Sequence, residues 1–67
     1  MEFKYKVQIS YLCDGKRVYR ERVYSAGDCQ WAANMARSEY GRLEGMRVER
    51  VWKETATGSW MAVNAWE

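Results

Sequence analysis

The stretch FKYKVQISYLCDGKRVYRERVY, residues 3–24, decides the fold of this chain. From Phe3 to Tyr11, large apolar side chains alternate with polar ones, which places one set against a core and the other in solvent. Asp14-Gly15 follows, and this dipeptide between two such runs is a strong β-hairpin signal. The sequence therefore predicts two antiparallel strands that turn near Asp14-Gly15.

The length of the turn decides which face of this hairpin carries the arginines. A two-residue loop would place Arg20 opposite Ile9 and Arg22 opposite Val7. Both arginines would then lie on the apolar face, where burying a charge is costly. This cost argues against the two-residue loop.

A three-residue loop at residues 14–16 avoids that placement. Val7 then faces Val23 and Tyr11 faces Tyr19, which keeps apolar side chains together. We expect this register because it moves the arginines into water. The polar face of the hairpin then collects Lys4, Lys6, Gln8, Arg20, Arg22 and Tyr24.

A helix is predicted after the hairpin. Ser25, with Asp28 three residues later, resembles a capping pattern in which the serine oxygen accepts from a free backbone N–H. Gly41 offers the left-handed residue expected just past a helix end. Helical spacing puts small side chains on one stripe, which indicates close packing on a sheet: Cys29, Ala32, Ala33, Ala36 and Tyr40.

A second hairpin is predicted in the last third of the chain. Residues 46–54 are rich in β-branched and aromatic side chains, 55–58 resemble a turn, and 59–66 alternate again. The first of these strands alternates imperfectly, which indicates either a bulge or burial on both faces. The fold class is therefore α+β: ββαββ, an antiparallel four-stranded sheet with one helix packed on one face.

Length and charge limit the function. The 67 residues form one small domain, 1–67, with no room for a deep catalytic cleft. The net charge is +2, but residues 1–25 hold six basic and three acidic side chains, whereas residues 26–67 hold five and six. The positive field is therefore expected at the first hairpin.

Residues that carry out catalysis or bind metals are scarce. The chain has no histidine, and Cys13 and Cys29 lack the spacing of a zinc site or a disulfide framework, so we expect both to be reduced. We expect no enzyme activity, no cofactor and no metal. The N-terminus shows no signal peptide or membrane span, so the expected compartment is the cytoplasm.

Two groups of residues are candidates for partner binding. The basic face, with Lys4, Lys6, Arg20, Arg22 and Tyr24, could contact phosphates and stack on a base, or it could simply be a solvated face.

The second group lies on the predicted helix. Trp31, with Met35 one turn on, lies opposite the alanine stripe and is either an exposed anchor or packed beneath another segment. At least two of Trp52, Trp60 and Trp66 are expected to form core or cross-strand contacts.

Part of the chain resembles a known family. The segment from Ser25-Ala26 through Ala32 and Ala36, the stretch Gly45-Met46-Arg47-Val48-Glu49-Arg50-Val51, and Trp60 are similar to small phage-encoded anti-CRISPR proteins that act on type I surveillance complexes. Proteins of this family are not enzymes; they bind backbone subunits or the guide-RNA groove. Many are acidic DNA mimics, whereas this chain is basic, so an acidic protein patch or nucleic acid held by the complex fits better.

Two functions follow as expectations. The first is a non-enzymatic inhibitor in a bacterial host cytoplasm that binds a type I CRISPR complex, or another acidic protein surface, and blocks target DNA by steric occlusion. The alternative is a small nucleic-acid-binding module that uses the basic, aromatic sheet face. The chain is expected to be a monomer or a small homo-oligomer.

Overall fold

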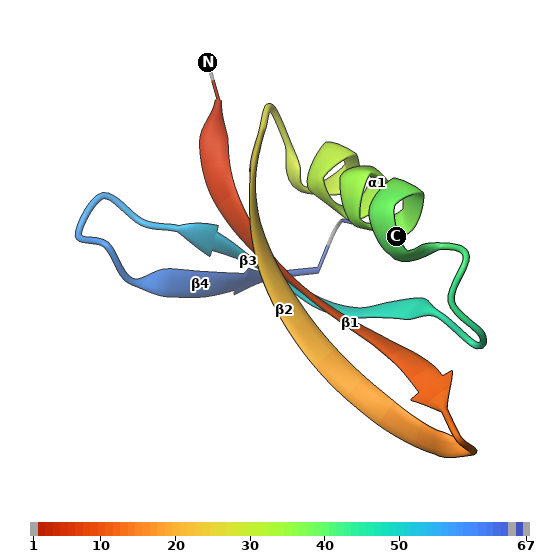
Figure 1. The fold of residues 1–67 in the computed structure, drawn as a ribbon. Coiled ribbons are helices and arrows are strands. Elements are labelled where there is room, and N and C mark those ends of the chain that lie inside the picture. Colours follow the sequence, from red (N-terminus) through yellow and green to blue (C-terminus); the bar gives the residue numbers. More distant parts are fainter. Residues whose placement is uncertain (1, 65, 67) are drawn as a thin grey trace.

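The computed structural model describes residues 2–64 and 66, and it confirms the α+β class and the ββαββ order (Figure 1). The four strands belong to one antiparallel sheet. The elements are β1 Phe3–Cys13, β2 Lys16–Ala26, α1 Cys29–Tyr40, β3 Arg47–Glu54 and β4 Trp60–Val63.

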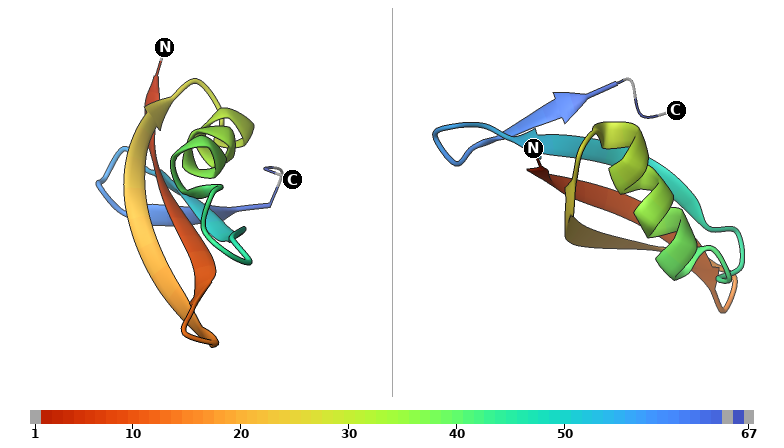
Figure 2. Two further views of the ribbon diagram at one scale, coloured as in Figure 1. Left: turned by 45° about the vertical axis from the view of Figure 1, so that its right-hand side comes forward. Right: turned by 90° about the horizontal axis from the view of Figure 1, so that it is seen from above.

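The strand order of the sheet is β2-β1-β3-β4, so β1 is central and β2 is an edge strand. The sheet is strongly twisted, and α1 lies along one of its faces (Figure 2). The opposite face, called the outer face below, is not covered by the one helix that the described residues form. Among the described residues, no helix combines the length and the apolar character needed to span a membrane.

The first hairpin has the two-residue loop, so the predicted three-residue register is wrong. Cys13 pairs with Lys16, and both Asp14 and Gly15 have positive φ, 52° and 76°. Positive φ at both central positions is the mark of a type I′ turn, whose twist matches that of the flanking strands. The pairing then runs without a shift from Cys13–Lys16 to Phe3–Ala26.

The predicted irregularity in the third strand is a β-bulge. Gln8 pairs with Arg50 and Ile9 pairs with Val48, so Glu49 is the extra residue of β3. A bulge leaves one residue unpaired and increases the local twist. The second hairpin is also present, although β4 is shorter than expected and ends at Val63. The alternation predicted at Ala65 lies outside the described residues.

The helix begins later than predicted. Its N-cap is Asp28, whose Oδ1 accepts from the backbone N–H of Trp31 at 2.7 Å, and Ser25 remains the penultimate residue of β2. Gly41 has a right-handed φ of −62°, so the predicted left-handed stop is also wrong. A Cβ at Gly41 would collide with the carbonyl oxygen of Arg37. A lack of space for a side chain, and not a left-handed φ, therefore accounts for a glycine at this position.

The stripe of small residues on α1 packs against the sheet as expected. Ala32, Ala33 and Ala36 are fully buried, and Cys29 and Tyr40 pack against the same core. Small side chains let the helix backbone approach the sheet closely. The sheet contributes the rest of the core: Tyr5, Val7, Ile9, Tyr24, Ala26 and Val51.

The revised helix start gives a paired prediction. Asp28→Ala removes the oxygen that satisfies the N–H of Trp31 and should destabilise the fold by about 1 kcal/mol. Ser25→Ala should change the free energy of unfolding by less than about 0.5 kcal/mol, because Ser25 is exposed and does not cap the helix. Urea unfolding of both variants measures the difference. A larger loss in the Ser25 variant would contradict the assigned N-cap.

Candidate functional site

The basic residues predicted to share one face lie on two faces. Arg20 pairs with Ile9 and Arg22 pairs with Val7. Because directly paired residues of an antiparallel ladder project to the same side, both arginines lie on the helix-bearing face. Lys4 and Lys6 alternate with the core residues of β1 and project from the outer face. The predicted single basic patch is therefore wrong.

The two-residue register does not bury the charges of Arg20 and Arg22, because β2 lies at the sheet edge. Arg20 and Arg22 are both exposed despite facing the helix side. Nη1 of Arg22 lies 2.9 Å from Oε1 of Glu39 on α1. Long side chains at the edge of a sheet can reach water and a helix carboxylate while only their stems cover apolar surface.

Tyr24 is a core residue, not a surface stacking residue. It is 8% exposed and belongs to the core cluster between α1 and the sheet. Its hydroxyl donates to Oε2 of Glu39 at 2.7 Å. Burial and this hydrogen bond to a carboxylate raise the pKa of Tyr24 above its usual value. Glu39 therefore joins α1 to β2 through both Arg22 and Tyr24.

Lys6 lies between two tryptophans on the outer face. Its Nζ is 5.2 Å from the ring centroid of Trp52 and 5.1 Å from that of Trp60. Trp52 is the direct partner of Lys6 in β3, whereas Trp60 reaches it diagonally from β4. The expected cross-strand role of these two tryptophans is confirmed, and Trp66 packs against the core. Lys6 therefore lies over one face of each ring in a cation–π arrangement.

Trp31 and Met35 differ in exposure. Trp31 is 58% exposed, the largest value among the exposed large apolar side chains. Met35 is half-buried and packs against the core. Trp31 is therefore exposed and not packed beneath another segment, whereas Met35 contributes to helix packing.

The free edge of β2 carries two apolar residues that the sequence placed in the core. Tyr19 and Val23 project from the outer face and are 52% and 48% exposed. The Asp14-Gly15 turn is the sequence signal that identifies Tyr19 and Val23 as surface residues. With the two-residue turn, the alternation of β2 places both side chains on the face opposite the helix.

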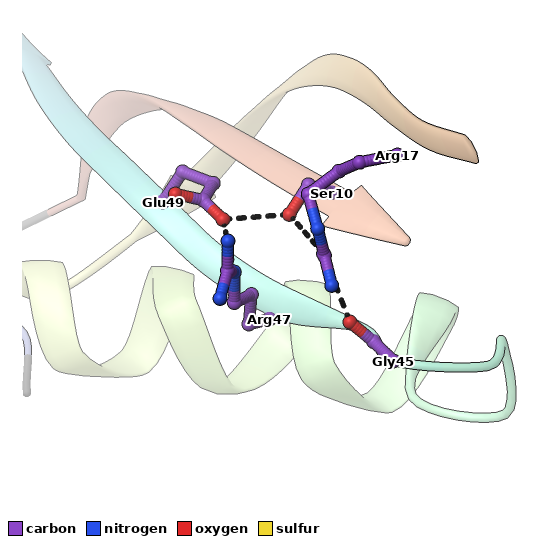
Figure 3. A network of polar contacts seen from close by, with 5 residues as sticks. All are labelled: Ser10, Arg17, Gly45, Arg47 and Glu49. Carbon is purple, nitrogen blue, oxygen red and sulfur yellow. Dashed lines mark hydrogen bonds and ion pairs between the residues drawn. The ribbon is translucent and has the colours of Figure 1, made fainter. Parts of the chain in front are cut away.

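A polar cluster around the buried Ser10 holds three strands and a loop together (Figure 3). The Ser10 hydroxyl is fully buried and donates to Oε1 of Glu49 at 2.6 Å. Nη1 of Arg17 donates to Oγ of Ser10 at 2.7 Å and to the carbonyl oxygen of Gly45 at 3.1 Å. Arg47 also pairs with Glu49. Since Ser10 is enclosed, its hydroxyl is inaccessible to a substrate.

A groove of about 530 Å³ opens between the start of β1 and the β3–β4 turn. Two carboxylates, Glu2 and Glu54, and two ammonium groups, Lys4 and Lys53, lie on its rim. This balance does not favour a ligand of either charge. Nζ of Lys53 lies 3.9 Å from the ring centroid of Phe3, one of the apolar lining residues.

The described residues offer no metal centre. Within 2–64 and 66, no group of three or more histidine, cysteine or acidic side chains comes together. Cys13 and Cys29 are both free thiols.

Comparison of the chain with protein-family models, with curated proteins and with solved structures finds no match. The surfaces of the molecule are therefore the basis for a functional proposal.

The Ser10 cluster predicts a pH dependence of stability. Hydrogen bonds from Ser10 and Arg47 hold the pKa of Glu49 below its ordinary value of 4.5. A carboxyl whose pKa is lowered by folding contributes stability above its unfolded pKa and loses that contribution as pH falls through the folded pKa. We therefore expect the free energy of unfolding to fall below about pH 4.5 more steeply in the native chain than in Glu49→Gln.

Urea unfolding as a function of pH measures this slope. Ser10→Ala, which removes one of the hydrogen bonds, should also flatten the profile. Identical acid profiles in all three proteins would contradict the role given to Glu49.

Proposed function

We propose that this chain is a non-enzymatic binding protein that acts by covering a surface of a larger complex. The exposure of Trp31 carries the proposal. Ala32 and Ala33, its neighbours in α1, are fully buried, so the helix is firmly seated while the tryptophan projects into solvent. Tryptophan is enriched at the energetic centres of interfaces, and a rigid helix presents it at small entropic cost.

The proposed partner is a protein complex with an acidic surface. The similarity of residues 25–36, 45–51 and Trp60 to small phage-encoded anti-CRISPR proteins suggests a type I surveillance complex in a bacterial host cytoplasm. The positive net charge and the exposed Arg20 on β2 favour an acidic protein patch. Occupation of such a patch would block target DNA sterically.

The alternative, a nucleic-acid-binding module, has less support. Its favourable feature is the outer face, where Lys4 and Lys6 lie near Trp52 and Trp60. That face lacks Arg20, Arg22 and Tyr24, which lie on the helix side, and Lys6 already lies over one face of each tryptophan ring. The exposed Arg50, which pairs with Gln8, adds one cation to this face, so the outer face offers fewer contacts for phosphates and bases than the single basic patch that the sequence predicted.

Inhibition of a reconstituted type I surveillance complex tests the proposed function. Increasing amounts of the protein should reduce binding of target DNA to the complex, measured by gel shift, for at least one subtype. The protein should show little affinity for free DNA or RNA. Unchanged DNA binding in every subtype would overturn the proposal, and tight, steeply salt-dependent binding to free nucleic acid would support the alternative.

Trp31→Ala separates binding from folding. The change in the free energy of unfolding should stay below about 0.5 kcal/mol, because the ring is largely in solvent. The affinity for the inhibited complex should fall by about 2 kcal/mol or more if Trp31 is an anchor. Ser38→Ala, at another exposed position of α1, is the matched control and should bind like the native chain. Equal affinities of the two variants would remove Trp31 from the interface.

A further inference from the structure

We propose that the free edge of β2 accepts an extended strand of the partner protein, one with acidic and apolar side chains at alternate positions. This inference takes from the proposed function only that the partner is a protein. The β2 edge, residues 16–26, is a surface separate from Trp31.

One side of the β2 backbone pairs with none of the residues 2–64 and 66. β2 has 11 residues, lies at the end of the strand order and, within the described part of the chain, pairs only with β1 (Figure 1). The pairing has no shift, so no bulge twists this edge away. An edge of this kind presents a row of backbone donors and acceptors to another strand. The other edge strand, β4, has only four residues and offers a much shorter row.

The side chains of the β2 edge alternate in a way that specifies the added strand. On the outer face, Tyr19 and Val23 are about half exposed, with the exposed Glu21 between them. On the helix face lie Arg20 and Arg22, both exposed. Arg22 is paired with Glu39, whereas Arg20 forms no ion pair with any residue that the structure describes. From residue 19 to residue 23 the order is apolar, basic, acidic, basic, apolar.

A complementary strand therefore carries the order apolar, acidic, basic, acidic, apolar. Residues directly opposite one another in a ladder share a face, so its acids meet Arg20 and Arg22 and its apolar residues cover Tyr19 and Val23. Each such pair contributes about 0.2–1 kcal/mol beyond the backbone hydrogen bonds. Because the pattern is the same in both directions, a parallel or an antiparallel strand satisfies it.

A second copy of this chain meets like charges in the two registers centred on the middle of the β2 edge. A twofold axis that relates two antiparallel β2 strands keeps the outer face of one copy beside the outer face of the other. Even-numbered residues must therefore pair with even-numbered ones, and odd-numbered with odd-numbered. Centring the axis on Glu21 opposes the two glutamates and sets Arg20 against Arg22, and centring it on Arg20 opposes two arginines. Like charges directly opposite each other are destabilising. β2 carries four cations and one carboxylate, which also favours an acidic strand over itself.

A designed peptide tests the strand acceptor on the full chain. The probe is the end-blocked peptide TTVEKEVTT, and the control TTEVKVETT has the same composition with acids and valines exchanged. In ¹H–¹⁵N spectra, the probe should cause saturable shifts at β2 amides, with an affinity about fivefold or more above that of the control, as two lost charge pairs imply. Alternate N–H groups of the bound probe point toward β2, and the others point away from it. Methylation of the backbone nitrogens that point toward β2 should abolish binding, whereas methylation of the others should preserve it.

Matched variants locate the contact. Arg20→Glu, at the unpaired arginine of the β2 edge, should weaken the probe about fivefold or more. Arg50→Glu, at an exposed arginine of β3, should leave probe binding unchanged. Equal binding of probe and control peptides, absence of β2 shifts at millimolar peptide, or β2 shifts that depend on protein concentration alone would each overturn the strand acceptor.

Failure of this inference differs from failure of the proposed function. If the chain inhibits a surveillance complex but the peptide pattern has no effect, the strand acceptor is wrong and the inhibitor stands. If the peptide binds β2 as described but no complex is inhibited, the strand acceptor stands and the proposed target is wrong.

Discussion

The two-residue turn at Asp14-Gly15 is the constraint on which the rest of the structure depends. Positive φ at both residues closes the hairpin with the twist that its strands require, and it fixes the pairing from Cys13–Lys16 to Phe3–Ala26. In a ladder with a period of two, a shift of one residue would exchange every side chain of β2 between the two faces. The turn thus determines which residues of β2 enter the core and which face solvent.

The core follows from that register. Tyr24 and Ala26 face the helix, and the alanines of α1 allow the helix to lie close above them. Glu39 then accepts a hydrogen bond from the Tyr24 hydroxyl and forms an ion pair with the Arg22 guanidinium, so a single carboxylate links α1 to the edge strand. The ion pair is partly exposed and contributes little by itself, about 0–1 kcal/mol.

Much of the architecture was predictable from the sequence because local signals agreed with one another. Alternation indicated the first hairpin, and the alanine stripe indicated the buried face of α1. The broken alternation around Val51 indicated either a bulge or burial on both faces, and the structure has the bulge, at Glu49. The cap was misplaced because Ser25 and Asp28 are both good N-cap residues. Only the continuation of β2 to Ala26, which leaves Ser25 in the strand, selects Asp28.

The candidate surface was less predictable, because the cost of placing arginines on the apolar face depends on more of the sheet than the first hairpin. In a hairpin, arginines beside Ile9 and Val7 are unfavourable, whereas at the edge of a four-stranded sheet they reach water and Glu39. The position of β2 at the sheet edge depends on β3 pairing with the other side of β1, which is a non-local fact. The exposure of Trp31 likewise depends on how the whole helix rotates on the sheet, and it follows once the alanines are buried.

Cross-strand nuclear Overhauser effects between backbone protons of β1 and β2 measure the register of the first hairpin. The two-residue turn predicts contacts that connect Val7 with Arg22 and Ile9 with Arg20, on either side of the Gln8–Glu21 pair. Contacts centred instead on Val7 with Val23 and Tyr11 with Tyr19 would show the three-residue loop. That result would return Arg20 and Arg22 to the face of Lys4 and Lys6 and would contradict the assignment of the β2 edge.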